Sequence, residues 1–67
     1  MIDGALMKVM KSRRLLEYNQ LIIETTKLLS LRFKPNPMQI KLRMENLIER
    51  GFLERDEDDK RMFKYIA

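Results

Sequence analysis

Basic side chains gather near the start of the chain, in the run Ala5–Arg14. Among them, Lys11 is the residue best placed to take part in a chemical reaction, through its amine. Apolar residues around it recur at spacings of three, four and one, which is typical of one face of an α-helix. They are Ile2, Ala5, Leu6, Val9 and Met10. At about 100° per residue, Lys11 projects roughly 170–180° from the centre of this face, and therefore into solvent. An exposed amine flanked by Lys8, Arg13 and Arg14 is either a solvated charge or an acceptor positioned for a modifying enzyme.

The residue types that the chain lacks limit the chemistry that it performs by itself. Neither cysteine nor histidine is present, which excludes disulfides, thiol nucleophiles, imidazole bases and the usual zinc sites. A lysine amine is protonated at neutral pH, so a partner must supply the base before Lys11 attacks a carbonyl carbon. We therefore expect a substrate rather than an enzyme, and no cofactor.

Length and charge indicate one small domain with a basic first half. A chain of 67 residues buries only about 60% of its unfolded surface, so its core is small. Residues 1–34 hold seven basic and three acidic residues and thus carry the whole formal charge of +4. Such a half suits an acidic partner, either nucleic acid or an acidic protein surface. No membrane partner is expected, because no apolar run approaches the roughly 20 residues of a membrane span.

Periodicity and capping signals predict three helices. The first runs from about Ile2 to Ser12 or Arg13, and the second runs from Gln20 to about Leu31 with Asn19 as its N-cap. The third begins at the pair Asn36-Pro37, as N-cap and first helical residue, and ends before Gly51. The residues of the second and third helices expected to face the core are Leu21, Ile22, Thr25, Leu28, Leu29, Ile40, Met44, Leu47 and Ile48.

Three short segments have the composition of strands: Arg14–Glu17, Phe52–Arg55 and Met62–Ile66. The polar run Asp56–Arg61 between the last two reads as a hairpin loop. The order helix, strand, helix, helix, hairpin predicts a mostly α, α+β fold of the winged-helix type, with residues 1–67 as a single domain. A three-helix bundle with a disordered tail is the alternative, less favoured because the tail carries aromatic groups worth burying.

A winged helix commonly binds nucleic acid, and this function is the alternative to protein modification. The third helix presents side chains that suit base recognition. They are Gln39, Arg43, Asn46 and Arg50. Glu45 and Glu49 lie on or near the same side, however, and the hairpin loop opens with the acidic run Asp56–Asp59. Because these carboxylates repel a polyanion, nucleic-acid binding is not favoured.

The six methionines divide between core and surface. Met10, Met44 and Met62 are predicted to fill the core, where a flexible thioether adapts to irregular gaps. Met7, near the border of the apolar face of the first helix, and Met38 are candidate exposed contacts.

The run Ala5–Arg14 closely resembles the neddylation segment of cullins, the scaffolds of multisubunit ubiquitin ligases. The similarity continues in order and spacing to the end of the chain. It includes Arg32-Phe33-Lys34-Pro35, Ile40-Lys41, Leu47-Ile48-Glu49-Arg50, Phe52-Leu53-Glu54-Arg55 and Tyr65-Ile66-Ala67. The resemblance implies the C-terminal winged-helix domain of a much longer cullin, in an SCF-like E3 ubiquitin ligase located in cytoplasm and nucleus.

The same resemblance implies that Lys11 accepts a Nedd/Rub-type ubiquitin-like modifier through an isopeptide bond, which activates the ligase. The implied partners are a RING-box protein with its conjugating enzyme, a Dcn-type co-ligase, a Cand-type exchange factor and the signalosome. Lys8, Arg13, Arg14 and Met7 are the expected partner-binding residues around the acceptor. Two positions depart from the family pattern: Lys8 stands where many cullins have Arg, and Tyr18 stands where His is frequent. Lys8 is also the nearest rival acceptor.

Overall fold

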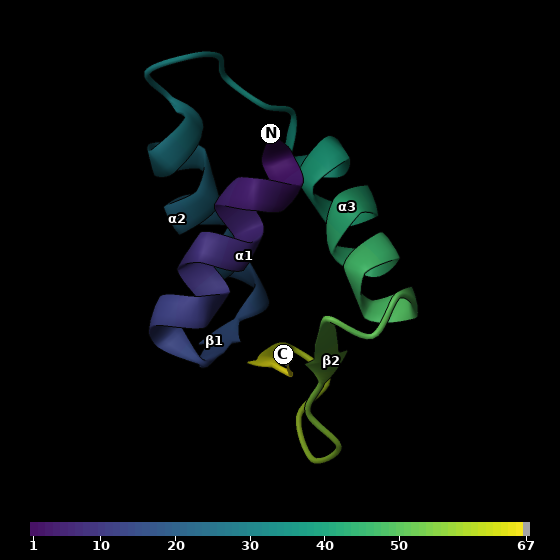
Figure 1. Ribbon diagram of the computed structural model, residues 1–67. Coiled ribbons are helices and arrows are strands. Elements are labelled where there is room, and N and C mark those ends of the chain that lie inside the picture. The colour runs from purple at the N-terminus through teal and green to yellow at the C-terminus, as the bar shows by residue number, and fades with distance from the viewer. Residues whose placement is uncertain (67) are drawn as a thin grey trace.

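The computed structural model describes residues 1–66 and contains three helices and three short strands (Figure 1). Their bounds are α1 Ile2–Arg13, β1 Leu15–Glu17, α2 Tyr18–Leu29, α3 Pro37–Glu49, β2 Leu53–Arg55 and β3 Met62–Tyr65. This is the predicted α+β winged-helix order. Ala67, the last residue of the resemblance to cullins, lies outside the described residues.

Helix α1 forms where the apolar period predicted it, and it lies between α2 and α3 (Figure 1). Its buried residues are Ala5, Leu6, Val9 and Met10. The helix ends because Arg14 takes a positive φ of 72° with ψ of −42°, while its N–H still donates to the Met10 carbonyl at 2.7 Å. An abrupt turn at Arg14 therefore directs the chain from α1 into β1.

Helix α2 begins at Tyr18, two residues earlier than predicted, so the assignment of Asn19 as N-cap is wrong. Strand β1 is held by its neighbour β3, and the extended backbone persists through Glu17 (φ −70°, ψ 149°). The Tyr18 N–H, which a side-chain cap would otherwise satisfy, donates instead to the Arg61 carbonyl at 2.7 Å. Pairing between distant strands thus sets this helix start.

The other end of α2 also differs from the prediction, because the helix ends at Leu29 rather than Leu31. Leu21, Thr25 and Leu29 face the core as expected, but Leu28 remains 41% exposed. Leu31 follows in the connection to α3 and is 95% exposed.

Helix α3 confirms the strongest local signal in the sequence. The Asn36 side chain accepts a hydrogen bond from the Met38 N–H at 2.8 Å, and Gln39 Oε1 accepts from the Asn36 N–H at 3.2 Å. Together these bonds form a capping box, with Pro37 as the first helical residue. At the other end Gly51 has a φ of +85°, the left-handed conformation expected of the residue that stops a helix.

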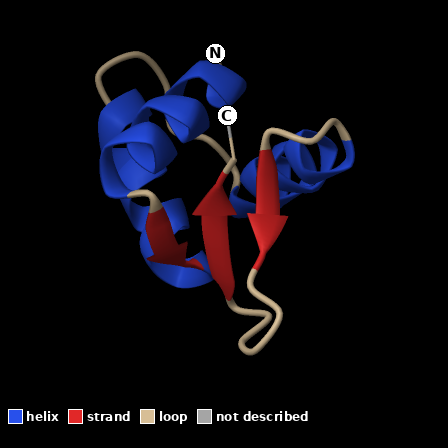
Figure 2. Ribbon diagram, turned by 60° about the horizontal axis from the view of Figure 1, so that its bottom comes forward, coloured by secondary structure: helices blue, strands red, loops and turns tan. Residues whose placement is uncertain are grey.

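The three strands form one antiparallel sheet in the order β1-β3-β2, with β3 in the middle (Figure 2). Leu16 lies opposite Phe63 and Leu53 lies opposite Tyr65. Because the last strand is the central one, the C-terminal segment is part of the fold. The alternative of a three-helix bundle with a disordered tail is therefore wrong.

The core lies where the sheet meets the three helices. Its fully buried large side chains are Leu6, Met10, Leu21, Ile40, Met44, Leu53 and Phe63. Met62, also predicted as core, is only half-buried. Thr25 is fully buried, and its hydroxyl has no hydrogen-bond partner within residues 1–66. No helix in the described part of the chain is both long and apolar enough to cross a membrane.

Candidate modification surface on the first helix

Lys11 lies on the exposed side of α1, as the helical projection predicted. Its amine takes part in no ion pair or side-chain hydrogen bond within residues 1–66. Lys8 and Met7 precede it by three and four residues, so both lie one turn below it on the same side of the helix. The amine is therefore free in solvent on a helix whose opposite face is anchored in the core.

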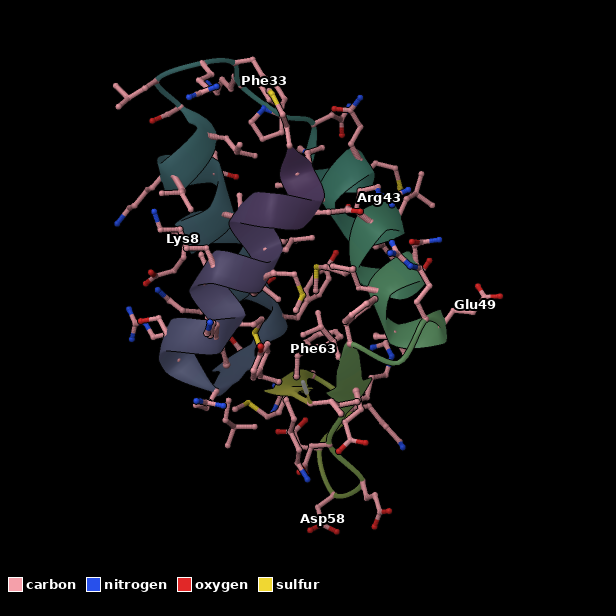
Figure 3. The ribbon with its side chains drawn as sticks, in the orientation of Figure 1. Lys8, Phe33, Arg43, Glu49, Asp58 and Phe63 are labelled. Atoms are coloured by element: carbon pink, nitrogen blue, oxygen red, sulfur yellow. The ribbon has the colours of Figure 1, made fainter. Side chains whose placement is uncertain are left out.

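Lys8 is exposed but directed to one side of this surface. It borders two hollows between α1 and α2, both of which Leu28 also lines, and Figure 3 shows its side chain extending toward α2. Met7 lies toward the other side, half-buried against the core, in a hollow shared with Gly4 and Phe52. The two residues thus flank the stem of Lys11 from opposite sides.

Arg13 is tied to α2. Its Nη2 lies 2.6 Å from Glu24 Oε2, and the same carboxylate oxygen accepts a hydrogen bond from Gln20 Nε2 at 3.0 Å. The Arg13 side chain is still half exposed, so one side of its guanidinium group remains open to solvent. Sequence reasoning placed Arg13 near Lys11 but missed Glu24, which lies eleven residues further along the chain.

Arg14 is tied to the sheet. Its guanidinium carbon lies 5.1 Å from the centre of the Tyr65 ring, within the range of a cation–π contact. The Tyr65 N–H also donates to the Arg14 carbonyl at 2.9 Å. The four predicted partner-binding residues therefore do not form one cluster: Lys8 and Arg13 lie on the α2 side, Arg14 lies on the β3 side, and Met7 lies toward β2 and α3.

The base-reading face predicted on α3 is engaged within the domain. Arg43 donates from Nε and Nη2 to the two carboxylate oxygens of Asp3, each at 2.7 Å, and Arg50 Nη1 lies 3.7 Å from the same carboxylate. Asn46 accepts a hydrogen bond from each of these arginines. Figure 3 shows Arg43 on the side of α3 that faces the start of α1. This face joins two helices, and the Asp3 carboxylate offsets part of the positive charge that a phosphate backbone would need.

Asp3 is the carboxylate that both arginines of that junction contact, and it was missed by sequence reasoning. The hydrogen bond from Arg43 is the main cause that lowers the pKa of Asp3 below its ordinary value, and the charges of Arg43 and Arg50 act in the same direction. Its only sequence signal is an acidic residue in the first turn of a helix.

The acidic hairpin loop is organised around Asp56. Its carboxylate accepts hydrogen bonds from the Asp58 and Asp59 N–H groups at 3.0 Å and lies 3.1 Å from Lys64 Nζ. The hydrogen bond with Lys64 is the main cause that lowers the pKa of Asp56. Asp58 stands at the far end of the loop, away from the helices (Figure 3). Within residues 1–66 no group of three or more acidic side chains is arranged to hold a metal ion.

Comparison with known proteins shows the family to which this chain belongs. The model of the cullin protein neddylation domain matches residues 1–59. The chain belongs to the cullin family. This cullin neddylation domain is 52% identical over 66 residues to Cullin-3B of Arabidopsis thaliana and 48% identical over 65 residues to Cullin-3 of Schizosaccharomyces pombe. These alignments cover 98% and 97% of the domain but only 9% and 8% of the two relatives, so the domain spans less than a tenth of their length.

The fold of this cullin domain also matches a solved structure from work on a dual E3 mechanism for Rub1 ligation to Cdc53, which pairs Dcn1(P) with Cdc53(WHB). The TM-score is 0.93 and the sequence identity 26%, with 98% of this domain and 76% of the other chain covered. The winged-helix architecture is thus shared with the matched structure.

Proposed function

We propose that Lys11 is the acceptor of a Nedd/Rub-type ubiquitin-like modifier, joined to it by an isopeptide bond. The observation that carries the proposal is the exposed, unengaged amine of Lys11 on a helix anchored by its opposite face. The match to the neddylation-domain family, which includes residues 1–59, supports it. The relationship to Cdc53(WHB), to which Rub1 is ligated, supports it as well.

The bond-forming step needs a partner. The Lys11 nitrogen attacks the activated carboxyl terminus of the modifier, the new C–N bond forms as the bond to the activating group breaks, and the amine gives up a proton. No acidic side chain within residues 1–66 forms an ion pair with Lys11, so the base is supplied in trans. In this proposal the domain is the substrate and part of a scaffold, and catalysis lies with its partners.

The partners follow from the same proposal. A RING-box protein brings the charged conjugating enzyme, and a Dcn-type co-ligase contacts the surface around Lys11 through Lys8, Arg13, Arg14 and Met7. The net charge of +4 in the first half of the chain supports attraction to an acidic co-ligase face. A Cand-type exchange factor would bind the unmodified form, and the signalosome would remove the modifier, in cytoplasm and nucleus.

The test uses the full-length cullin with the charged conjugating enzyme, the RING-box protein and the co-ligase. Lys11→Arg should abolish the attachment of a single modifier. Lys8→Arg, the matched control one turn away, should be modified at the wild-type rate. Peptide mass spectrometry of the wild-type product should place the adduct on Lys11. Attachment to Lys11→Arg at an undiminished rate, or an adduct mapped to Lys8, would refute the assignment.

Nucleic-acid binding is the weaker function because the α3 arginines that would contact DNA are bound to Asp3. A titration with duplex DNA at moderate salt checks this. We expect no saturable binding in the micromolar range, and tight binding with a steep salt dependence would restore the nucleic-acid hypothesis.

A further inference from the structure

A groove runs along one side of α1, between this helix and α2. It consists of two adjoining hollows of about 190 Å³ and about 370 Å³, which share Lys8 and Leu28. One end lies at Met1 and Arg32, and the other lies at Ser12 and Arg13. The groove therefore extends along nearly the whole of α1, whose twelve residues span about 18 Å.

The groove has an apolar base with an uncovered leucine. Ala5, Val9 and Leu29 form its floor and are buried. Leu28 stands in its wall, 41% exposed, although its place on α2 predicted a core position. The opposite wall, formed by α1, includes Gly4, which has no side chain to fill the groove. A Cβ atom placed on Gly4 would meet nothing within 4 Å. An apolar side chain entering from solvent would thus find both space and a leucine to cover.

The rim of the groove is basic. Lys8 and Arg32 are exposed and take part in no ion pair within the described part of the chain, while Arg13 shares its charge with Glu24. The groove thus has two free positive charges and one neutralised pair. Carboxylates on a ligand would be attracted by these charges, and apolar groups on the same ligand would gain binding free energy by covering Leu28.

We propose that this groove binds a protein segment that carries both apolar and acidic side chains. Its length accommodates about five extended residues or about three turns of helix. The concave shape favours a peptide chain over a flat lipid surface, and the apolar wall offers nothing to a phosphate backbone. The groove shares Lys8 and Arg13 with the surface proposed above for the co-ligase, but Lys11 lines neither hollow, so the proposal does not depend on modification of Lys11.

The test selects peptides of about 12 residues, the length of a helix matching α1, from a random library on the immobilised chain. We expect enriched peptides to combine acidic with leucine-like residues. In a titration followed by amide chemical shifts, they should shift Lys8, Leu28 and Arg32. Leu28→Ser and the double variant Lys8→Glu with Arg32→Glu should each weaken binding by about tenfold or more.

Matched controls separate the groove from general charge and apolarity. Leu42→Ser removes an exposed leucine from α3, 57% exposed against 41% for Leu28. Lys41→Glu with Lys60→Glu reverses two exposed lysines elsewhere. Both should leave peptide binding unchanged, and unfolding curves of every variant show that each remains folded. The proposal is wrong if no peptide is enriched, if the enriched peptides lack acidic residues, or if Leu28→Ser binds them as tightly as the wild type. Duplex DNA or anionic vesicles that shift the same amides more strongly would also overturn it.

Discussion

Arg14 lies between two elements, since it caps the end of α1 and directly precedes β1. Its positive φ is a conformation that side chains with a Cβ atom adopt at a cost of about 1–3 kcal/mol. Two contacts with Tyr65 hold Arg14 in this conformation: the cation–π contact with the Tyr65 ring and the hydrogen bond from the Tyr65 N–H to the Arg14 carbonyl. The last turn before this strained residue is the one that carries Lys11.

Replacements at Arg14 should measure that strain. Arg14→Gly and Arg14→Ala both remove the guanidinium group, so they differ mainly in the backbone. We expect the glycine variant to be more stable than the alanine variant by about 1 kcal/mol, the reverse of their usual order in helices. Urea unfolding followed by circular dichroism gives the comparison, and an alanine variant of equal or greater stability would show that the turn is unstrained.

Helix α2 contains a buried polar defect. The Thr25 hydroxyl is fully buried without a hydrogen-bond partner in the described residues, and such a group loses its hydration without compensation. Thr25→Val keeps the branched shape and removes the hydroxyl. It should raise the free energy of unfolding by about 1 kcal/mol.

The neighbouring Thr26 provides the control, because it is only half-buried. Thr26→Val should change stability by less than about 0.5 kcal/mol. A loss of stability in Thr25→Val, measured by the same urea unfolding, would mean that the hydroxyl is satisfied, for example by a buried water molecule.

Helices α1 and α3 are joined at their exposed edge by Asp3 and Arg43. Because Arg43 lowers the pKa of Asp3 in the folded state, the folded protein binds the proton less readily than the unfolded chain. The stabilisation is therefore complete above the ordinary carboxyl pKa of about 3.9 and is lost as pH falls through the lower folded value. Asp3→Asn should lower the urea midpoint at about pH 7, and the difference from wild type should shrink as pH falls below about 4.

The acidic loop offers a contrast for this pH experiment. Asp58 lies at the loop tip and forms no ion pair within residues 1–66, so Asp58→Asn should leave the urea midpoint nearly unchanged. A midpoint difference for Asp3→Asn that is constant from neutral to acidic pH would show that the carboxylate charge does not stabilise this junction.

At the scale of the whole molecule, β3 joins the two strands β1 and β2, which do not pair with each other. It pairs with β1 on one side and β2 on the other, and Phe63 projects from it into the core at 1% exposure. The Phe63 ring lies 6.0 Å from that of Tyr18 and 5.0 Å from the guanidinium carbon of Arg55. One side chain thus contacts the start of α2, strand β2 and the core.

Truncation at this position should affect the whole domain. Phe63→Ala should cost about 3–5 kcal/mol, comparable with the total stability expected of a domain this small. We expect the variant to lose its cooperative thermal transition, measured by circular dichroism. Ile66→Ala, at an exposed position in the same segment, should retain it. A cooperative Phe63→Ala variant near the wild-type midpoint would mean that the helices are stable without the Phe63 ring in the core.

The sequence by itself determined the features that depend on neighbours along the chain. The apolar period of residues 2–13 placed Lys11 in solvent, the Asn36-Pro37 pair set the start of α3, and Gly51 set its end. Each of these follows from side chains within one or two helical turns, so local pattern was sufficient. The family was also recognisable, since its motifs occur in order along the chain.

Only the tertiary structure decided the features that join distant residues. The start of α2 follows from the pairing of β1 with β3, and the engagement of Asp3 by Arg43 spans forty positions of sequence. The exposure of Leu28 depends on how closely α1 approaches α2, which neither helix reveals alone. Local periodicity determines which way a side chain points, but the packing of elements determines whether anything is there to meet it.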